Sequence, residues 1–192
     1  MQSVQNTLNQ GEKKQFVYSW FGEENREESN VITLEGDNSE VDVYGIFYGR
    51  DSSTLKNSVK IVHKGRNTRA NVFACGVVVD RSFLDFSGML RVEHGAKGTR
   101  TFFRANLMIL SPKSSAYTFP GLEIEENDIT QGGHAATIGK VNEEQMFYLM
   151  SRGLGENEAK KIVIHGFFEP VLSQINNADQ AILRKKLSGI LD

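Results

Sequence analysis

VKIVHKGRNTRANVFACGVVVD, residues 59–80, is followed by MLRVEHGAKGTRTFFRANLMIL, residues 89–110, and the two segments match after a shift of about 31 residues. The shift superposes His63 on His94, and each segment reads as a hydrophobic strand, a polar corner and a second strand. A repeat of this kind predicts a coil that stacks on itself, as in a β-solenoid. Short strands with regular turns also occur in β-sandwiches, which stay open as an alternative from the pattern alone.

The chain divides into three parts by composition. Residues 1–14 are rich in Gln, Asn and Lys and have little to bury, so we expect a flexible N-terminal arm. Residues 15–140 are dominated by short β-rich segments separated by Gly, Asn, Asp and Ser, which predicts a β-helix core. Helical periodicity begins after this core, and residues 141–192 are therefore predicted to be a C-terminal helical region.

Three helices are predicted in the C-terminal region. The first begins after Asn142, a residue type that caps helix N-termini, and ends at Gly153. The second covers about residues 156–165, because Gly166 is placed to end it and Pro170 is expected to force a break. The third begins near Asp179.

Composition excludes several classes of function. The chain has 192 residues, a formal net charge of -2 and one cysteine, which argues against nucleic-acid binding and against a disulfide framework. No apolar run approaches the roughly 20 residues that span a bilayer, and no signal peptide is apparent, so we expect a cytoplasmic protein without a membrane partner. Phosphate-binding and hydrolase motifs are absent from the sequence, and we do not expect an enzyme.

Several long motifs over about residues 58–175 resemble, in order, the core of the SufB/SufD family. They are HKGRNTRANVFACG, SGMLRVEHGAKGTRTFFRANLMIL, AYTFPGLEI, GGHAATIGKV and EEQMFYLMSRGLGENEAKKIVIHGFFEPV. The resemblance implies a mainly β fold, a right-handed parallel β-helix followed by a helical region. It also implies a scaffold subunit for iron–sulfur cluster assembly that works with SufC, an ABC-type ATPase. Family members pair through their last strands, so we expect a homodimer, or a heterodimer with a SufB/SufD homologue, that pairs around residues 100–137.

His134, in the small-residue stretch GGHAAT, is the candidate cluster or metal ligand. Imidazole suits iron and zinc, and the resemblance places this histidine near the subunit interface. The alternative is a histidine that is hydrogen-bonded at a packed dimer interface. At three positions where the family carries ligand candidates, this chain has Ala105, Gly132 and Ala135, which have no donor atoms. We therefore expect no firmly bound cofactor, with a transient iron–sulfur cluster left open.

The resemblance places the ATPase-docking surface on the C-terminal helices. The candidate docking residues are Tyr148, Arg152, Gly153, Gly166 and Phe167. An apolar helix stripe with aromatics and an arginine is also what a partner groove uses. We expect Phe147 and Leu149 instead to pack the helices onto the end of the β-helix.

The remaining reactive side chains have plainer interpretations. Cys75 lies in a strand-like run and is expected to be a small buried hydrophobe. His63 and His94 are expected to be solvated corner residues, and His165 lies near a predicted helix end. Two other functions stay open: a β-helix protein that binds a metal through histidines for another chemistry, and a purely structural homodimer that has lost its cluster ligands.

Overall fold

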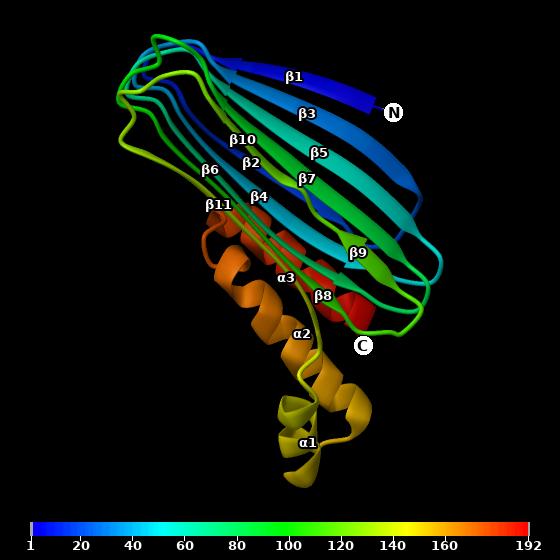
Figure 1. The fold of residues 1–192 in the computed structure, drawn as a ribbon. Helices are drawn as coiled ribbons and strands as arrows, with labels where there is room; N and C mark the ends of the chain where they lie inside the picture. The colour runs from blue at the N-terminus through cyan, green and yellow to red at the C-terminus, as the bar shows by residue number, and fades with distance from the viewer. Residues whose placement is uncertain (1, 192) are drawn as a thin grey trace.

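The computed structural model describes residues 2–191 (Figure 1). These residues form a long β region followed by three helices. The strands are β1 (Gln2–Leu8), β2 (Lys13–Trp20), β3 (Arg26–Leu34), β4 (Glu40–Gly49), β5 (Thr54–His63), β6 (Arg69–Val78), β7 (Phe83–Val92), β8 (Arg100–Ile109), β9 (Ser115–Tyr117), β10 (Pro120–Ile124) and β11 (Gln131–Lys140). The helices are α1 (Glu143–Ser151), α2 (Glu156–Leu172) and α3 (Asn177–Leu191).

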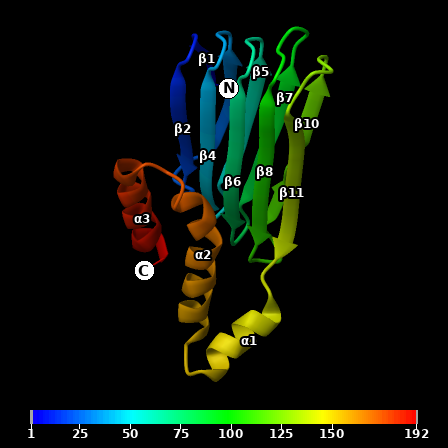
Figure 2. The same cartoon turned by 90° about the vertical axis from the view of Figure 1, so that its left-hand side faces the viewer.

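The strands alternate between two parallel sheets. One sheet has the order β1-β3-β5-β7-β10, with β9 also pairing with β7, and the other has the order β11-β8-β6-β4-β2. Each coil of the chain therefore contributes to both sheets, and successive coils stack in register, as Figure 2 shows from the side. This arrangement is a β-solenoid, and the predicted fold class, a parallel β-helix with a C-terminal helical region, is confirmed.

Coil length varies along the chain. Arg69 in β6 pairs with Arg100 in β8, which is the shift of 31 residues seen in the sequence repeat. In the other sheet, however, His63 pairs with Val92 and not with His94. His94 is an exposed turn residue, as expected, whereas His63 is completely buried. The expectation of a solvated corner for His63 is therefore wrong. The corner between β7 and β8, residues 93–99, is two residues longer than the corner between β5 and β6, residues 64–68, so the shift of 31 residues does not apply to the strands before these corners.

Residues with left-handed backbone conformation lie at the corners of the solenoid. Asn38 and Asn67 have φ values of 59° and 53°, and Asp51 and Asp80 have values of 56° and 55°. Asn and Asp tolerate this region better than other side-chain-bearing residues. Successive corners are also linked, since the backbone N–H of Asp51 donates to Oδ2 of Asp80 at 2.9 Å. These links hold neighbouring coils in register.

The space between the two sheets is filled by apolar side chains. Strand residues alternate in direction, so every second residue points inward. Phe47, Phe86 and Phe103 form an aromatic stack in this interior, with ring centroids 5.2 Å and 5.6 Å apart. All three side chains are buried.

The N-terminal residues differ from the sequence expectation. Residues 2–8 form β1, which pairs with β3 from Gln2 opposite Glu28 to Leu8 opposite Leu34, and β2 begins at Lys13. Met1, part of the expected arm, lies outside the described residues. Only Leu8 in β1 is buried, so this polar strand is ordered mainly by its backbone hydrogen bonds to β3. Backbone pairing leaves no pattern in the side chains, and the sequence therefore could not indicate the strand.

The helices begin close to where the sequence predicts, but the second is longer than predicted. Asn142 caps α1 by accepting from the backbone N–H groups of Glu144 and Gln145. Helix α2 continues through Gly166 and Pro170 to Leu172, so the predicted break is wrong. An internal proline costs about 3 kcal/mol, and burial of side chains on both sides of it offsets this penalty. These side chains include Phe168 and Leu172.

Helices α2 and α3 lie against the outer face of the sheet that contains β4 and β6, whereas α1 projects beyond the strand ends (Figures 1 and 2). The second hydrophobic core lies between these helices and that sheet face. It includes Ile46, Val77 and Met108 from the strands and Val163 and Leu183 from the helices. Within residues 2–191, no helix is long and apolar enough to cross a membrane.

Candidate functional surfaces

The last coil leaves one end of the solenoid uncovered. Strands β10 and β11 are the final strands of their sheets, and the chain then turns into α1. Nearly every residue of β11 is exposed although the strand lies beside the core strand β8. Its outer edge presents backbone N–H and C=O groups without a neighbouring strand, which is the arrangement that another chain can extend.

His134 lies in the middle of β11. It pairs in register with Phe103 of β8, and registered residues of parallel strands point to the same face. Because Phe103 points into the core, the imidazole of His134 points toward the inner face of the last coil, where no further coil covers it. Within the described part of the chain, the imidazole of His134 has no hydrogen-bond partner.

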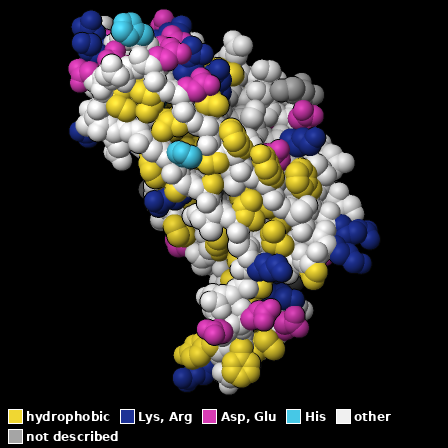
Figure 3. Space-filling model, viewed as in Figure 1, with side chains coloured by type: hydrophobic (Ala, Val, Ile, Leu, Met, Phe, Trp, Pro, Cys, Tyr) yellow, Lys and Arg dark blue, Asp and Glu magenta, His cyan; other side chains and the backbone are white. Residues whose placement is uncertain are grey.

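Apolar side chains surround this uncovered end. Their exposed fractions lie between 42% and 54%, unusually high for large hydrophobic residues. We call them, together with His134, the open-end surface: Tyr117, Phe119, Ile124 and Ile138. Figure 3 views this end of the solenoid and shows apolar side chains gathered across it, with charged side chains mainly at the margins.

The three positions that lack the family's ligand side chains do not all lie on the same face of β8 and β11. Ala105 and Gly132 lie on the inward face with His134, whereas Ala135 lies on the opposite face beside Arg104. Ala105 is completely buried. A side chain at Gly132 would be tightly confined, because a Cβ there would lie 3.1 Å from Cδ1 of Ile124.

The described residues offer few ligands for a metal or cluster. No group of three or more His, Cys, Asp or Glu side chains in residues 2–191 is arranged to hold a metal ion. Cys75 is buried beneath the helices on the outer face of β6, and burial raises the pKa of its thiol to about 12. A cluster at the open end would therefore receive an imidazole from His134 and no thiolate from the described part of this chain.

The second candidate surface lies on the helices. Phe147 is 74% exposed and Tyr148 is 57% exposed, so Phe147 does not pack onto the β-helix as expected. The reason is the position of α1: Met146 and Leu149 face the helical core, and Phe147 lies on another face of the helix. We define the α1–α2 surface by its exposed apolar side chains, which are Phe147, Tyr148, Met150 and Ile162.

The predicted docking residues border this surface. The guanidinium of Arg152 lies 5.3 Å from the centroid of the Tyr148 ring, within the range of a cation–π contact. Gly153 has a φ of 95°, which allows the chain to leave α1 sharply. Gly166 and Phe167 line a groove of about 410 Å³ between α2 and β8. Tyr148 thus lies on α1, with Arg152 and Gly153 directly after it, and Gly166 and Phe167 lie on α2.

Sequence reasoning missed the apolar residues of the open-end surface and the exposure of Phe147. The stretch AYTFPGLEI contains Tyr117, Phe119 and Ile124, and its density of large apolar residues next to Pro and Gly was the available signal. The structure adds that no later coil covers these side chains.

An uncovered strand edge and an exposed apolar helical surface on a parallel β-solenoid are typical of proteins that associate with other chains. The family model described as "SUF system FeS cluster assembly, SufBD core domain" matches residues 4–167. This match covers most of the chain, which therefore belongs to the SufBD family of iron–sulfur cluster assembly proteins.

Curated relatives agree with this assignment. The chain is 34% identical over 146 residues to the iron–sulfur cluster assembly protein SufD of Bacillus subtilis, covering 76% of this chain and 33% of that protein. It is 31% identical over 145 residues to a SufBD family protein of Mycobacterium leprae, covering 76% of this chain and 17% of the relative. A third relative, from Galdieria sulphuraria, is 28% identical over 158 residues, which cover 82% of this chain and 70% of that protein. The matched region thus spans a third or less of the first two relatives.

Proposed function

We propose that this chain is a non-enzymatic scaffold subunit that supports iron–sulfur cluster assembly in two ways. It binds the ABC-type ATPase of the SUF system, SufC, on the α1–α2 surface, and it pairs with a second SufB/SufD-type chain through the open-end surface. The cluster is the cargo of this assembly and not a resident cofactor. The observation that carries the proposal is the exposure of Phe147 and Tyr148 on a helix that projects from the solenoid.

The composition of the α1–α2 surface supports docking. Aromatic residues, Met and Arg are enriched at protein–protein interfaces, and exposed apolar patches on a folded domain mark interaction sites. Tyr148 and Arg152 already contact each other, which reduces the side-chain freedom that is lost on binding. The adjacent groove beside Phe167 could accept an apolar side chain of the ATPase.

The open-end surface supports pairing with another solenoid. A long strand edge with exposed apolar neighbours is normally protected by charges, prolines or a covering element. Strand β11 has one charged residue, Lys140 at its end, so a second strand could pair along most of its length. A two-fold partner would also cover Ile138 and Ile124, which are partly exposed in the single chain.

The arrangement assigns a limited chemical role to this chain. Iron–sulfur clusters are held mainly by thiolates, and His134 offers one imidazole at the open end. Cys75 is buried beneath the helices. We therefore infer that thiolates for a nascent cluster come from the partner, and that this chain positions the partner and the ATPase.

A second candidate function is metal binding for another chemistry. The observation that favours it is the exposed His134 imidazole without a hydrogen-bond partner in the described chain. Metal analysis of anaerobically purified protein, compared with His134→Ala, tests it directly. Stoichiometric zinc or iron that disappears in the variant would support this candidate, and equal trace amounts in both proteins would reject it. A structural homodimer outside the pathway would show neither metal nor ATPase binding.

Co-purification with the ATPase of the SUF system tests the leading proposal. We expect the wild-type chain to retain the ATPase and the double variant Tyr148→Ala, Arg152→Ala to lose it. The control is Arg66→Ala, which removes an exposed arginine away from the helices and from the open-end surface. Unchanged ATPase binding by the Tyr148 and Arg152 variant would reject this surface as the docking site.

A further inference from the structure

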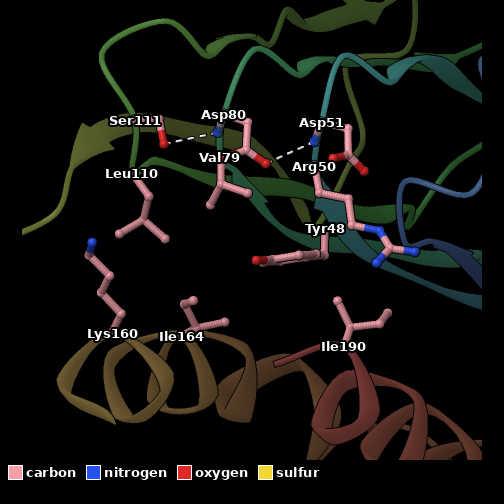
Figure 4. A pocket seen from close by; sticks show the side chains of 10 residues that line it. All are labelled: Tyr48, Arg50, Asp51, Val79, Asp80, Leu110, Ser111, Lys160, Ile164 and Ile190. Carbon is pink, nitrogen blue, oxygen red and sulfur yellow. Dashed lines mark hydrogen bonds between the residues drawn. The ribbon is translucent and has the colours of Figure 1, made fainter. Parts of the chain in front are cut away.

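The helices cover only half of the outer face of the sheet that contains β2, β4, β6, β8 and β11. Figure 4 shows the covered half, where Ile164 and Ile190 of the helices face Tyr48 and Leu110 near the ends of β4 and β8. The half near the strand starts, the upper part of the front sheet in Figure 2, has no helix over it. Side chains on this half are therefore open to another chain.

Two arginines of β8 lie on this uncovered half. Phe103 points into the core, so Arg100, Phe102 and Arg104 point outward on the alternate positions of the strand. Both arginines are exposed, and within residues 2–191 neither guanidinium forms an ion pair. The guanidinium of Arg104 lies 5.4 Å from the centroid of the Phe102 ring. The strand thus presents two unpaired positive charges with an aromatic ring between them.

The arginine on the neighbouring strand differs, because its charge is balanced. Arg69 of β6 lies in register with Arg100, and its guanidinium contacts Glu40 at 2.9 Å and Asp42 at 3.1 Å. Both carboxylates belong to β4, so the inner strands match their own charges. Arg100 instead lies beside another arginine, which is unfavourable between neighbouring strands without a further anion. An unmatched positive charge at the margin of this face therefore indicates a partner of opposite charge.

The last strand leaves these arginines accessible from its free edge. The outward residues of β11 are uncharged and mostly small, and they are Gln131, Gly133, Ala135, Thr137 and Gly139. A Cβ on Gly133 would lie 3.2 Å from the Phe102 ring, so this ring lies close against β11. Since neighbouring strands are about 4.8 Å apart, a strand added to the edge of β11 lies about 10 Å from β8. An arginine and a glutamate side chain together can bridge that distance across the small residues.

We propose that Arg100 and Arg104 select the partner of this chain by binding carboxylates on the outer face of the partner's pairing strand. The inference rests on the proposed pairing along β11 and adds the chemistry of the partner, a second solenoid with Asp or Glu at outward positions of its edge strand. A second copy of this chain lacks such residues, because the only charged residue of β11 is Lys140. Two copies would also place four arginines on one continuous face, so self-pairing is weaker than pairing with an acidic strand.

Mixed dimers of wild type and an acidic-strand variant, Thr137→Glu with Arg104→Gln, test this inference. Thr137→Glu places a carboxylate on the outer face of the pairing strand, and Arg104→Gln removes the neighbouring arginine of the same chain. Both positions are exposed, so the fold is retained. Wild type labelled with ¹⁵N is mixed with an equal amount of the variant, and native mass spectrometry at low ionic strength counts mixed dimers and self-dimers. We expect about threefold more mixed dimers than random pairing gives, the effect of an exposed ion pair.

Two matched controls separate charge from pairing itself. The neutral variant Thr137→Gln with Arg104→Gln, mixed with wild type, should lose most of the excess. The acidic-strand variant mixed with Arg100→Gln, Arg104→Gln should lose it as well, and salt at about 0.5 M should remove it by screening. Random mixing of wild type with the acidic-strand variant would overturn the inference while the self-dimers uphold the proposed pairing. Absence of all dimers would overturn both.

Discussion

His134 and Phe103 lie side by side in the register of β11 and β8, yet Phe103 is completely buried and His134 is exposed. The difference arises because Phe103 has a neighbouring strand on both sides, whereas His134 has one on a single side. The residues of the last coil thus have the same strand register as those of the inner coils, but one side of the coil is not covered by another strand. This relationship explains why the open-end surface is suited to a second solenoid.

Replacing Ile138 with Asp should prevent pairing through the open end. Ile138 is partly exposed on β11, and a carboxylate there would be buried without a partner in a two-fold interface. Analytical ultracentrifugation at micromolar concentration should show the dimer mass for wild type and the monomer mass for the variant. Ile182→Asp, an exposed position on α3, is the control and should stay dimeric. A wild-type chain that sediments only as monomer would contradict self-pairing.

Replacing Phe103 with Ala should destabilise the solenoid by about 3–5 kcal/mol, the usual effect of removing a buried phenylalanine. Phe103 is completely buried and stacks on Phe86 with a centroid separation of 5.6 Å. Urea unfolding followed by circular dichroism measures the change. Phe147→Ala, by comparison, should change stability by no more than about 0.5 kcal/mol, because that ring is exposed. Equal effects of the two substitutions would disagree with the packing described.

His63 should make the fold less stable as pH falls. Its Nδ1 lies 2.8 Å from Oγ1 of Thr68, and burial lowers its pKa from 6.5 to about 4. Between these values the unfolded chain binds a proton that the folded chain does not, so this contribution is present above pH 6.5 and is lost as pH falls toward 4. The loss amounts to about 3 kcal/mol in total.

The variant His63→Gln isolates this effect. Its free energy of unfolding should depend less steeply on pH than that of wild type between pH 6.5 and 4, measured by urea titrations at each pH. His94→Gln should keep the wild-type dependence, because His94 is exposed. Parallel pH curves for wild type and His63→Gln would show that His63 does not titrate differently on folding.

Cys75 should resist thiol reagents while the protein is folded. Its side chain is buried beneath the helices, and burial raises the pKa of the thiol to about 12, so little thiolate forms near neutral pH. We expect slow reaction with a disulfide reagent in buffer and rapid reaction of one thiol in denaturant. Rapid labelling of the native protein would instead make Cys75 a candidate for sulfur chemistry.

The sequence predicted the solenoid because its signal is local: a hydrophobic strand followed by a polar corner recurs in every coil. The burial of His63 was not predictable in this way, because it depends on the corner after β7 being two residues longer than the corner after β5. Pro170 is a similar case. Local rules end a helix there, but the packing of Phe168 and Leu172 against the sheet keeps α2 continuous.

The candidate surfaces were predictable in part. The sequence assigned Leu149 to packing and Tyr148 to docking, and in the structure Leu149 contacts the helical core whereas Tyr148 is exposed. Periodicity does not show whether another element covers a given face, and for this reason Phe147 was assigned to packing although it is exposed.

Anaerobic reconstitution tests most directly whether this chain binds the ATPase while another chain supplies the thiolates of the cluster. The chain is incubated with iron, sulfide and the ATPase of the SUF system, with and without a thiol-bearing SufB/SufD homologue, and the visible spectrum and bound iron are recorded. We predict a stable but colourless complex of the chain with the ATPase, and cluster absorption only after the homologue is added. Cluster absorption from the chain and ATPase without the homologue would contradict the account, and its loss in His134→Ala would then make His134 a ligand of a self-sufficient scaffold.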